Sequence, residues 1–233
     1  MKLALSAIIL SSALALGAVA CRSSATLENA NQTSSKENTN NAEPQTATGG
    51  VERFRIDARQ SQVTAHIGVG GLLSALGHDH TVAIRDFSGE AQVTSVSLEP
   101  ASLQLTINAS SLAETDKEFS DSDRRKIDRA IQEEALETAK YPQIVFKSTK
   151  VSAKKTGDGQ YQVQIEGELA LHGVTRAITI PAQVSVSGDT VSARGEFTVR
   201  HSDYQIKRIS AGGGTVIAKE EITLSCNIVG TKI

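Results

Sequence analysis

The sequence predicts an all-β domain, an antiparallel β-barrel of about eight strands with one α-helix. Three observations support this fold: apolar and polar residues alternate over long runs, short turns separate several runs, and one segment has helical spacing. Between Gln162 and Leu171, apolar residues occupy one face, and Gln and Glu occupy the other. Strict alternation of this kind is typical of strands with one face in a core and one in water.

The same alternation recurs along the chain after residue 51. Long runs cover 191–200 and 222–228, and shorter ones cover 63–69, 103–107 and 178–180. Turn residues at 154–159 and 187–189 predict antiparallel hairpins between neighbouring runs. About eight antiparallel strands favour a sheet closed on itself, whose interior either is filled by side chains or holds one slender ligand.

One segment, from about 122 to 140, reads as a helix. Asp121, Ser122 and Asp123 supply capping oxygens at its start. Its apolar stripe consists of Ile127, Ala130, Ile131 and Ala135. Tyr141-Pro142 ends it, because the residue before a proline is pushed out of the α region.

The first twenty residues read as a signal peptide. Lys2 precedes an uncharged stretch, Leu3 to Ala20, which ends in small residues directly before Cys21. Three interpretations remain open. In the first, cleavage after Ala-x-Ala releases a soluble periplasmic or secreted protein. In the second, lipid attachment to Cys21 anchors a lipoprotein, although Ala18 stands where a lipobox usually has Leu. An uncleaved membrane helix is the third.

Residues 21–50 read as a disordered tether, and residues 51–233 form the folded domain. Between Arg22 and Gly50, Leu27 is the only large aliphatic residue, so this stretch cannot bury enough apolar surface to fold. A tether of this length suits a domain held near a membrane through a lipid on Cys21. We therefore expect a membrane-anchored lipoprotein that faces the periplasm.

Charge and motifs exclude several function classes. The chain has 24 basic and 26 acidic residues, a net charge of −2, and its densest basic cluster, 124–126, is surrounded by Asp residues. A nucleic-acid partner is therefore not expected. No Gly-x-Ser-x-Gly elbow or phosphate-binding loop occurs, so we expect no enzyme activity.

The inward faces of the strands form the predicted lumen. Aromatic residues make up only 3% of the chain, so small and medium side chains line the interior. The pattern alone leaves two outcomes open, an apolar cavity or a structural protein with a filled barrel. The candidate ligand-binding residues are Val63, Ile67, Leu105, Ile165, Leu169, Leu171, Phe197, Val199 and Leu224.

His78 and His80 are the candidate metal ligands. On a strand, residues two apart point to the same side, and neutral imidazoles in this arrangement bind metals. This gives an alternative function, a metal- or haem-binding redox protein. In the other interpretation, both histidines form ordinary hydrogen bonds at the barrel rim, and the protein has no metal or haem cofactor.

Four stretches of the domain resemble the YceI-like family of exported bacterial proteins. They are Phe54-Arg55-Ile56-Asp57, Tyr141 to Ser148 (YPQIVFKS), Gly167 to Arg176 (GELALHGVTR) and Phe197 to Tyr204 (FTVRHSDY). The resemblance covers nearly all of 53–233. Two departures mark a less typical branch: Phe54 stands where Trp is common, and a Gly-His-Asp-His segment occupies 77–80.

The resemblance implies a lipocalin-like barrel and an apolar lipid ligand of the polyisoprenoid type. It thereby favours a lipid-holding lumen over a filled one. The implied function is storage or transport of this lipid in the bacterial cell envelope. The expected partners are the lipid and, through Cys21, a membrane.

Overall fold

The structure, a computed structural model, describes residues 50–94 and 98–233. The predicted signal peptide (1–20), Cys21 and the predicted tether up to residue 49 lie outside the described residues. Within the described part, the chain forms one α-helix, α1 (Asp121–Arg129). The strands there are β1 (Val51–Ile56), β2 (Gln62–Gly70), β3 (His80–Ile84), β4 (Phe87–Thr94), β5 (Ser102–Asn108), β6 (Leu112–Glu114), β7 (Gln143–Gly157), β8 (Gln160–Leu171), β9 (Val174–Ser187), β10 (Thr190–Arg200), β11 (Ser210–Ala211) and β12 (Val216–Lys232).

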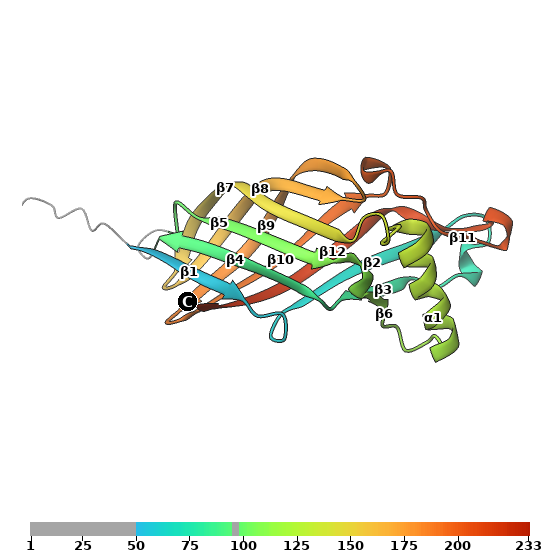
Figure 1. Cartoon of the computed structure of the whole chain (residues 1–233), viewed down its shortest axis with the longest axis horizontal. Coiled ribbons are helices and arrows are strands. Elements are labelled where there is room, and N and C mark those ends of the chain that lie inside the picture. The colour runs from blue at the N-terminus through green and yellow to red at the C-terminus, as the bar shows by residue number, and fades with distance from the viewer. Residues whose placement is uncertain (1–49, 95–97) are drawn as a thin grey trace, which may run out of the picture. The chain divides into compact units, whose positions relative to one another are not determined.

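The strands close into an antiparallel barrel, as the alternation predicts (Figure 1). In the described part of the chain, eight of them form a ring in the order β1, β4, β5, β7, β8, β9, β10 and β12. Pairing of Phe54 with Lys232 and of Ile56 with Gly230 joins β1 to β12 and completes the ring. Closure satisfies the backbone hydrogen bonds along both edges of the sheet.

β12 is long enough to pair with two strands along the same edge. Its last residues pair with β1, and the stretch from Ile217 to Asn227 pairs with β2. β2 then pairs with β3, and β3 with β6. The barrel wall therefore continues past the closed ring, with β2, β3 and β6 prolonging β1, β4 and β5 at one end (Figure 1).

The helix covers the edge that β6 leaves open. Asp128 on α1 accepts a 2.7 Å hydrogen bond from the backbone N–H of Glu114 on β6. The Ser120 side chain caps the helix by accepting a hydrogen bond from the N–H of Asp123, so the cap lies one residue before the predicted capping residues 121–123. Figure 1 shows α1 beside β6, at the end of the barrel opposite the C-terminus.

The helical segment is shorter and less regular than the predicted 122–140. The α-helix ends at Arg129 and continues as a wider π-helical turn, Ala130–Ala135, in which Leu136 N–H donates to Ile131 O at 2.9 Å. This turn keeps Ile131, Ala135 and Leu136 all facing the barrel interior. Packing therefore determines the end of the helix well before Tyr141-Pro142.

The largest fully buried side chains are Tyr204, Phe54 and Val82, so the family position where Phe replaces Trp is part of the core. Among the described residues, no helix has the length and apolar character needed to cross a membrane.

Candidate functional site

The barrel encloses two apolar cavities that lie end to end. The inner cavity has a volume of about 220 Å³, and the helix-side cavity, which is lined in part by α1, has about 330 Å³. Ala65, Leu112, Leu136, Ile206 and Ile222 line both, so the two cavities adjoin, and we call them together the lumen. Their joint volume falls within the range of about 300–1,000 Å³ that is typical of sites for small organic ligands.

Every lumen residue predicted from the sequence lines this space. Ile67 lines the helix-side cavity. The inner cavity is lined by the other eight, Val63, Leu105, Ile165, Leu169, Leu171, Phe197, Val199 and Leu224. Among the described residues that line the inner cavity, only Ser102 and Cys226 carry a side-chain heteroatom. Its wall therefore offers almost no hydrogen bonds to a ligand, and it suits hydrocarbon.

Small side chains keep the lumen open. A row of cross-strand neighbours on β8, β9, β10, β12 and β2 consists of Val163, Ala182, Gly195, Cys226 and Val63. Its three central members are among the smallest residues that could stand there. Because side chains so short cannot reach across an eight-stranded barrel, the interior retains unfilled space.

Cys226 is the free cysteine of the described part of the chain. Its Sγ lies 3.3 Å from the Gly195 carbonyl oxygen, to which the thiol donates a hydrogen bond. Burial raises the pKa of this thiol, so the nucleophilic thiolate is disfavoured. The residue serves as a small apolar part of the wall.

The helix-side cavity is the more polar end of the lumen. His80, Lys126, His201 and Ser210 are among its lining residues. His201 is 6% exposed, and its Nδ1 donates to the Glu220 carbonyl oxygen at 3.1 Å. Burial lowers the pKa of His201, which favours the neutral ring at neutral pH. Nε2 of the neutral ring is then a hydrogen-bond acceptor.

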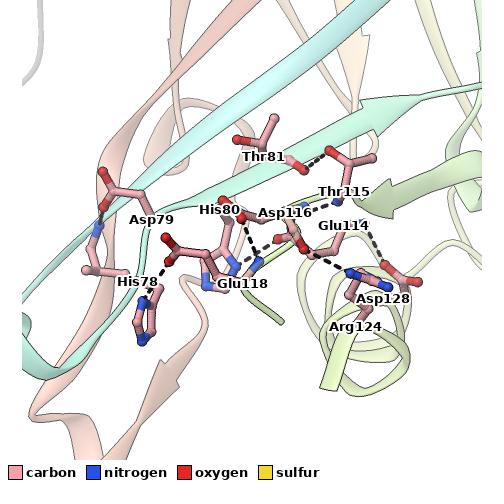
Figure 2. A network of polar contacts seen from close by, with 11 residues as sticks. His78, Asp79, His80, Thr81, Glu114, Thr115, Asp116, Glu118, Arg124 and Asp128 are labelled. Carbon is pink, nitrogen blue, oxygen red and sulfur yellow. Dashed lines mark hydrogen bonds and ion pairs between the residues drawn. The ribbon is translucent and has the colours of Figure 1, made fainter. Parts of the chain in front are cut away.

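The predicted metal ligands His78 and His80 belong to a polar network at this end (Figure 2). His80 begins β3, and its Nδ1 donates to Glu114 Oε2 at 2.9 Å. His78 precedes the strand, and its Nδ1 lies 3.3 Å from Glu118 Oε2. Both rings contact Phe119, His80 by stacking and His78 by its edge.

Glu114 is the buried centre of this network. Its side chain is fully buried, and Oε1 accepts 2.8 Å hydrogen bonds from the N–H groups of Thr115 and Asp116. With His80, three donors therefore compensate for burial of the carboxylate. The network fastens β3 to β6 and to the loop before α1.

This geometry gives the metal prediction no support. His78 and His80 point to different carboxylates, and no group of three or more His, Cys, Asp or Glu side chains among residues 50–94 and 98–233 is arranged to hold a metal ion. Glu114 and Phe119 are not among the site residues predicted from the sequence. One signal was available, because Glu114 follows Leu112 by two residues and so places an acid on the inward face.

Another histidine, His172, holds the turn between β8 and β9 in place. Its Nδ1 donates to the Tyr204 carbonyl oxygen at 3.1 Å, and its Nε2 lies 2.9 Å from Glu137 Oε2. The ring also packs edge-on against Tyr141, with 4.6 Å between centroids. His172 therefore ties this hairpin to the segment that follows the helix.

The outer face of the sheet has a larger hollow, of about 750 Å³. Its side chains are mostly polar, among them Gln162, Gln164, Arg194 and Asn227, and the two glutamines are exposed to solvent. Because such groups already bond to water, the hollow gives an apolar ligand no advantage. The lumen is the better candidate site.

A closed antiparallel barrel around an apolar lumen is a lipocalin-like fold. More narrowly, the chain belongs to the YceI-like family, since the model of the YceI-like domain matches residues 54–230. Protein YceI of Escherichia coli O157:H7 is 32% identical over an alignment of 133 residues, and the match covers 53% of this chain and 61% of that protein. A UPF0312 protein of Shewanella denitrificans is 29% identical over an alignment of 126 residues, and the match covers 53% of this chain and 60% of that protein. The chain thus covers less than two thirds of these relatives.

Solved structures share the fold at low sequence identity. BcnA of Burkholderia cenocepacia superposes with a TM-score of 0.58 at 20% identity, covering 76% of this chain and 99% of BcnA. A polyisoprenoid binding domain from Saccharophagus degradans gives a TM-score of 0.53 at 13% identity, covering 77% of this chain and 98% of that domain. These similarities confirm the predicted barrel fold.

Proposed function

We propose that the protein binds an apolar lipid of the polyisoprenoid type in its lumen. The observation that carries this proposal is the lumen of two adjoining cavities, whose inner part is lined almost wholly by hydrocarbon. A long, flexible hydrocarbon chain fits a narrow space of this shape better than a compact polar molecule does. The polyisoprenoid binding domain that shares the fold supports the same ligand class.

The proposed role is storage or transport of the lipid in the bacterial cell envelope. A long isoprenoid is never free in water, so the relevant exchange is between a bilayer and the lumen. Both environments are apolar, and the free-energy difference between them is small compared with about 0.8 kcal/mol per CH₂ for transfer from water. Loading and release are therefore both accessible, as a carrier requires.

The proposal includes no catalytic step. Cys226, the one thiol of the described residues in contact with the lumen, has a raised pKa, and the polar groups at the helix side consist of two histidines, a lysine and a serine. These groups suit the polar end of an otherwise apolar lipid, with His201 Nε2 as a hydrogen-bond acceptor.

Location in the periplasm and anchoring through Cys21 belong to the same proposal. They rest on the charge pattern of residues 1–21 and on the composition of 22–50. Labelling with a radioactive fatty acid in a bacterial host, compared between the wild type and Cys21→Ser, distinguishes an anchored lipoprotein from a soluble periplasmic protein.

Extraction of the purified protein into organic solvent, followed by mass spectrometry, tests lipid binding. We expect a stoichiometric isoprenoid lipid when the protein is isolated from a bacterial envelope. Metal analysis of the same sample, with His78→Ala and His80→Ala variants as references, tests the metal- or haem-binding alternative. Protein that carries neither lipid nor metal would leave a structural or interaction role as the better description.

A further inference from the structure

Two loops at the helix end of the barrel form an uncharged surface, which we call the barrel tip. It consists of residues 70–77, which begin at the last residue of β2, and residues 209–218, which include β11 and the start of β12. Neither segment contains Asp, Glu, Lys or Arg, although charged residues make up 21% of the chain. Both are built from Gly, Ala, Ser, Thr and aliphatic residues.

The tip exposes three leucines within five residues. Leu72 is 89% exposed, Leu76 is 74% exposed, and Leu73 is 44% exposed. The other large hydrophobic residues that the described part of the chain exposes are Val51, which begins β1, and Ile233, the last residue. β1 and the C-terminus lie at the end of the barrel opposite α1 (Figure 1). Soluble proteins rarely concentrate exposed aliphatic side chains in this way unless the surface contacts something apolar.

The two loops are held together as one surface. Leu73 N–H donates to the Thr215 carbonyl oxygen at 3.0 Å, and β11 pairs with the start of β12. Gly71, with a φ of +101°, allows this approach, because a Cβ there would lie only 2.5 Å from the Thr215 oxygen. The leucines are therefore presented by a fixed backbone.

The tip borders the lumen. Ser210, Ala211, Val216 and Ile217 of the tip line the helix-side cavity, as does Val69 directly before it. In Figure 1, β11 lies at the same end of the barrel as α1. The exposed leucines thus lie beside the end of the site that would receive a lipid.

A cation stands at the edge of this apolar surface. Lys219 follows the tip, is exposed, and has no acidic side chain within ion-pair distance among the described residues. Its aliphatic stem crosses β2 at Gly68, where a Cβ would lie 2.9 Å from Lys219 Cδ. This arrangement matches the surface of a bilayer, where the leucines would contact acyl chains and the lysine would contact lipid phosphates.

We propose that the barrel tip inserts shallowly into a phospholipid bilayer and so places the helix side of the lumen against the membrane. Insertion is limited to the interface, because the exposed backbone of 212–214 needs water or headgroups for its hydrogen bonds. This inference rests on the proposed lipid-carrying function, since it states where the lipid enters. The alternative occupants of the tip are a second copy of the chain and another protein.

The absence of Trp from the sequence makes the contact directly measurable. Leu76→Trp places a single fluorophore on the tip of the full-length protein, and Ile233→Trp places the matched fluorophore at the opposite end. Each variant is mixed with vesicles of phosphatidylethanolamine and phosphatidylglycerol, with and without brominated acyl chains. We expect a blue shift and quenching by bromine for Leu76→Trp, and neither for Ile233→Trp.

A second substitution tests whether the leucines cause the contact. Adding Leu72→Asp to Leu76→Trp should weaken vesicle binding about tenfold or more, because a charge then replaces a leucine that the bilayer would bury. Absence of quenching at position 76, or equal quenching at both ends, overturns the proposal. If the emission of Leu76→Trp shifts to the blue with rising protein concentration in the absence of vesicles, the tip is a self-association surface instead.

Lipid extraction of the same variants separates this inference from the proposed function. If the wild-type protein carries lipid but Leu76→Trp shows no contact with the bilayer, the lumen function stands and the docking surface is refuted. If the protein contacts the bilayer but never contains extractable lipid, the lumen function is refuted and the membrane-binding tip stands.

Discussion

Ala65→Phe is the sharpest test of the lumen as a binding site. Ala65 lies on β2, is 7% exposed, and lines both cavities, so its side chain stands where they join. Its cross-strand neighbours are Val82 and Leu224. A phenyl ring at this position extends into the space between the cavities and divides the lumen in two.

The expected change in stability is small. Burying a phenylalanine contributes about 1.5–3 kcal/mol, and crowding in a core costs about 1–3 kcal/mol. Because unfilled space already adjoins Ala65, we expect the two effects nearly to cancel, leaving the free energy of unfolding within about 1 kcal/mol of the wild type.

The expected change in binding is large. The ring displaces about six carbon atoms of ligand, and each buried CH₂ is worth about 0.8 kcal/mol relative to water, which sets an upper limit near ~5 kcal/mol. Loss of only about two such groups already weakens binding roughly tenfold. The ligand for this test is a short isoprenoid alcohol that dissolves measurably in water, so that its binding reports transfer from water into the lumen.

Titration of delipidated protein with this alcohol, followed by calorimetry, measures the effect. Thr64→Phe is the matched control, because Thr64 adjoins Ala65 and lines the polar outer hollow instead of the lumen. We expect weakened binding by Ala65→Phe and wild-type binding by Thr64→Phe. Equal affinities for all three proteins would refute binding in the lumen.

Three further predictions concern His201, Gly173 and Cys226. Burial lowers the pKa of His201, so the unfolded chain takes up the proton first as the pH falls; the free energy of unfolding is therefore full above about pH 6.5 and declines toward the lowered native pKa. The thermal stability of His201→Asn should depend less on pH in this window. A pH profile equal to that of the wild type would contradict the assignment. Gly173→Ala should destabilise the protein by about 1–3 kcal/mol in urea unfolding, because φ is +75° there and the new Cβ would lie 2.6 Å from the Tyr141 ring; wild-type stability would show that the hairpin relaxes without cost. Alkylation of Cys226, followed by peptide mass spectrometry, should be slow in the folded protein and slower still once lipid fills the lumen, whereas a rate unaffected by lipid would separate Cys226 from the bound ligand.

The strands and their inward faces could be predicted from the sequence because alternation is a local property. Once Gln162 to Leu171 forms a strand, Ile165 and Leu169 must share a face, whatever the partner strands are. The nine predicted lumen residues line the cavities for this reason. The ring is less local, because β12 has to pair with both β1 and β2 along one edge.

The polar network could not be predicted because its members are far apart in the chain. His80 and Glu114 are separated by 34 residues and meet only through the pairing of β3 with β6. The sequence pattern showed two histidines at strand spacing, which is typical of metal ligands, but the carboxylates around them come from another strand and loop. The end of the helix at Arg129 likewise depends on contacts with the barrel.

Sequence alone therefore determined the β-barrel class, the family resemblance and which side chains face inward. Only the tertiary structure decided that these side chains leave an unfilled apolar lumen, since cavity volume depends on how all strands pack around it. It also decided that the loops 70–77 and 209–218 form one uncharged tip beside that lumen. Each loop is unremarkable by itself, and the pairing of β12 with β2 brings the two together.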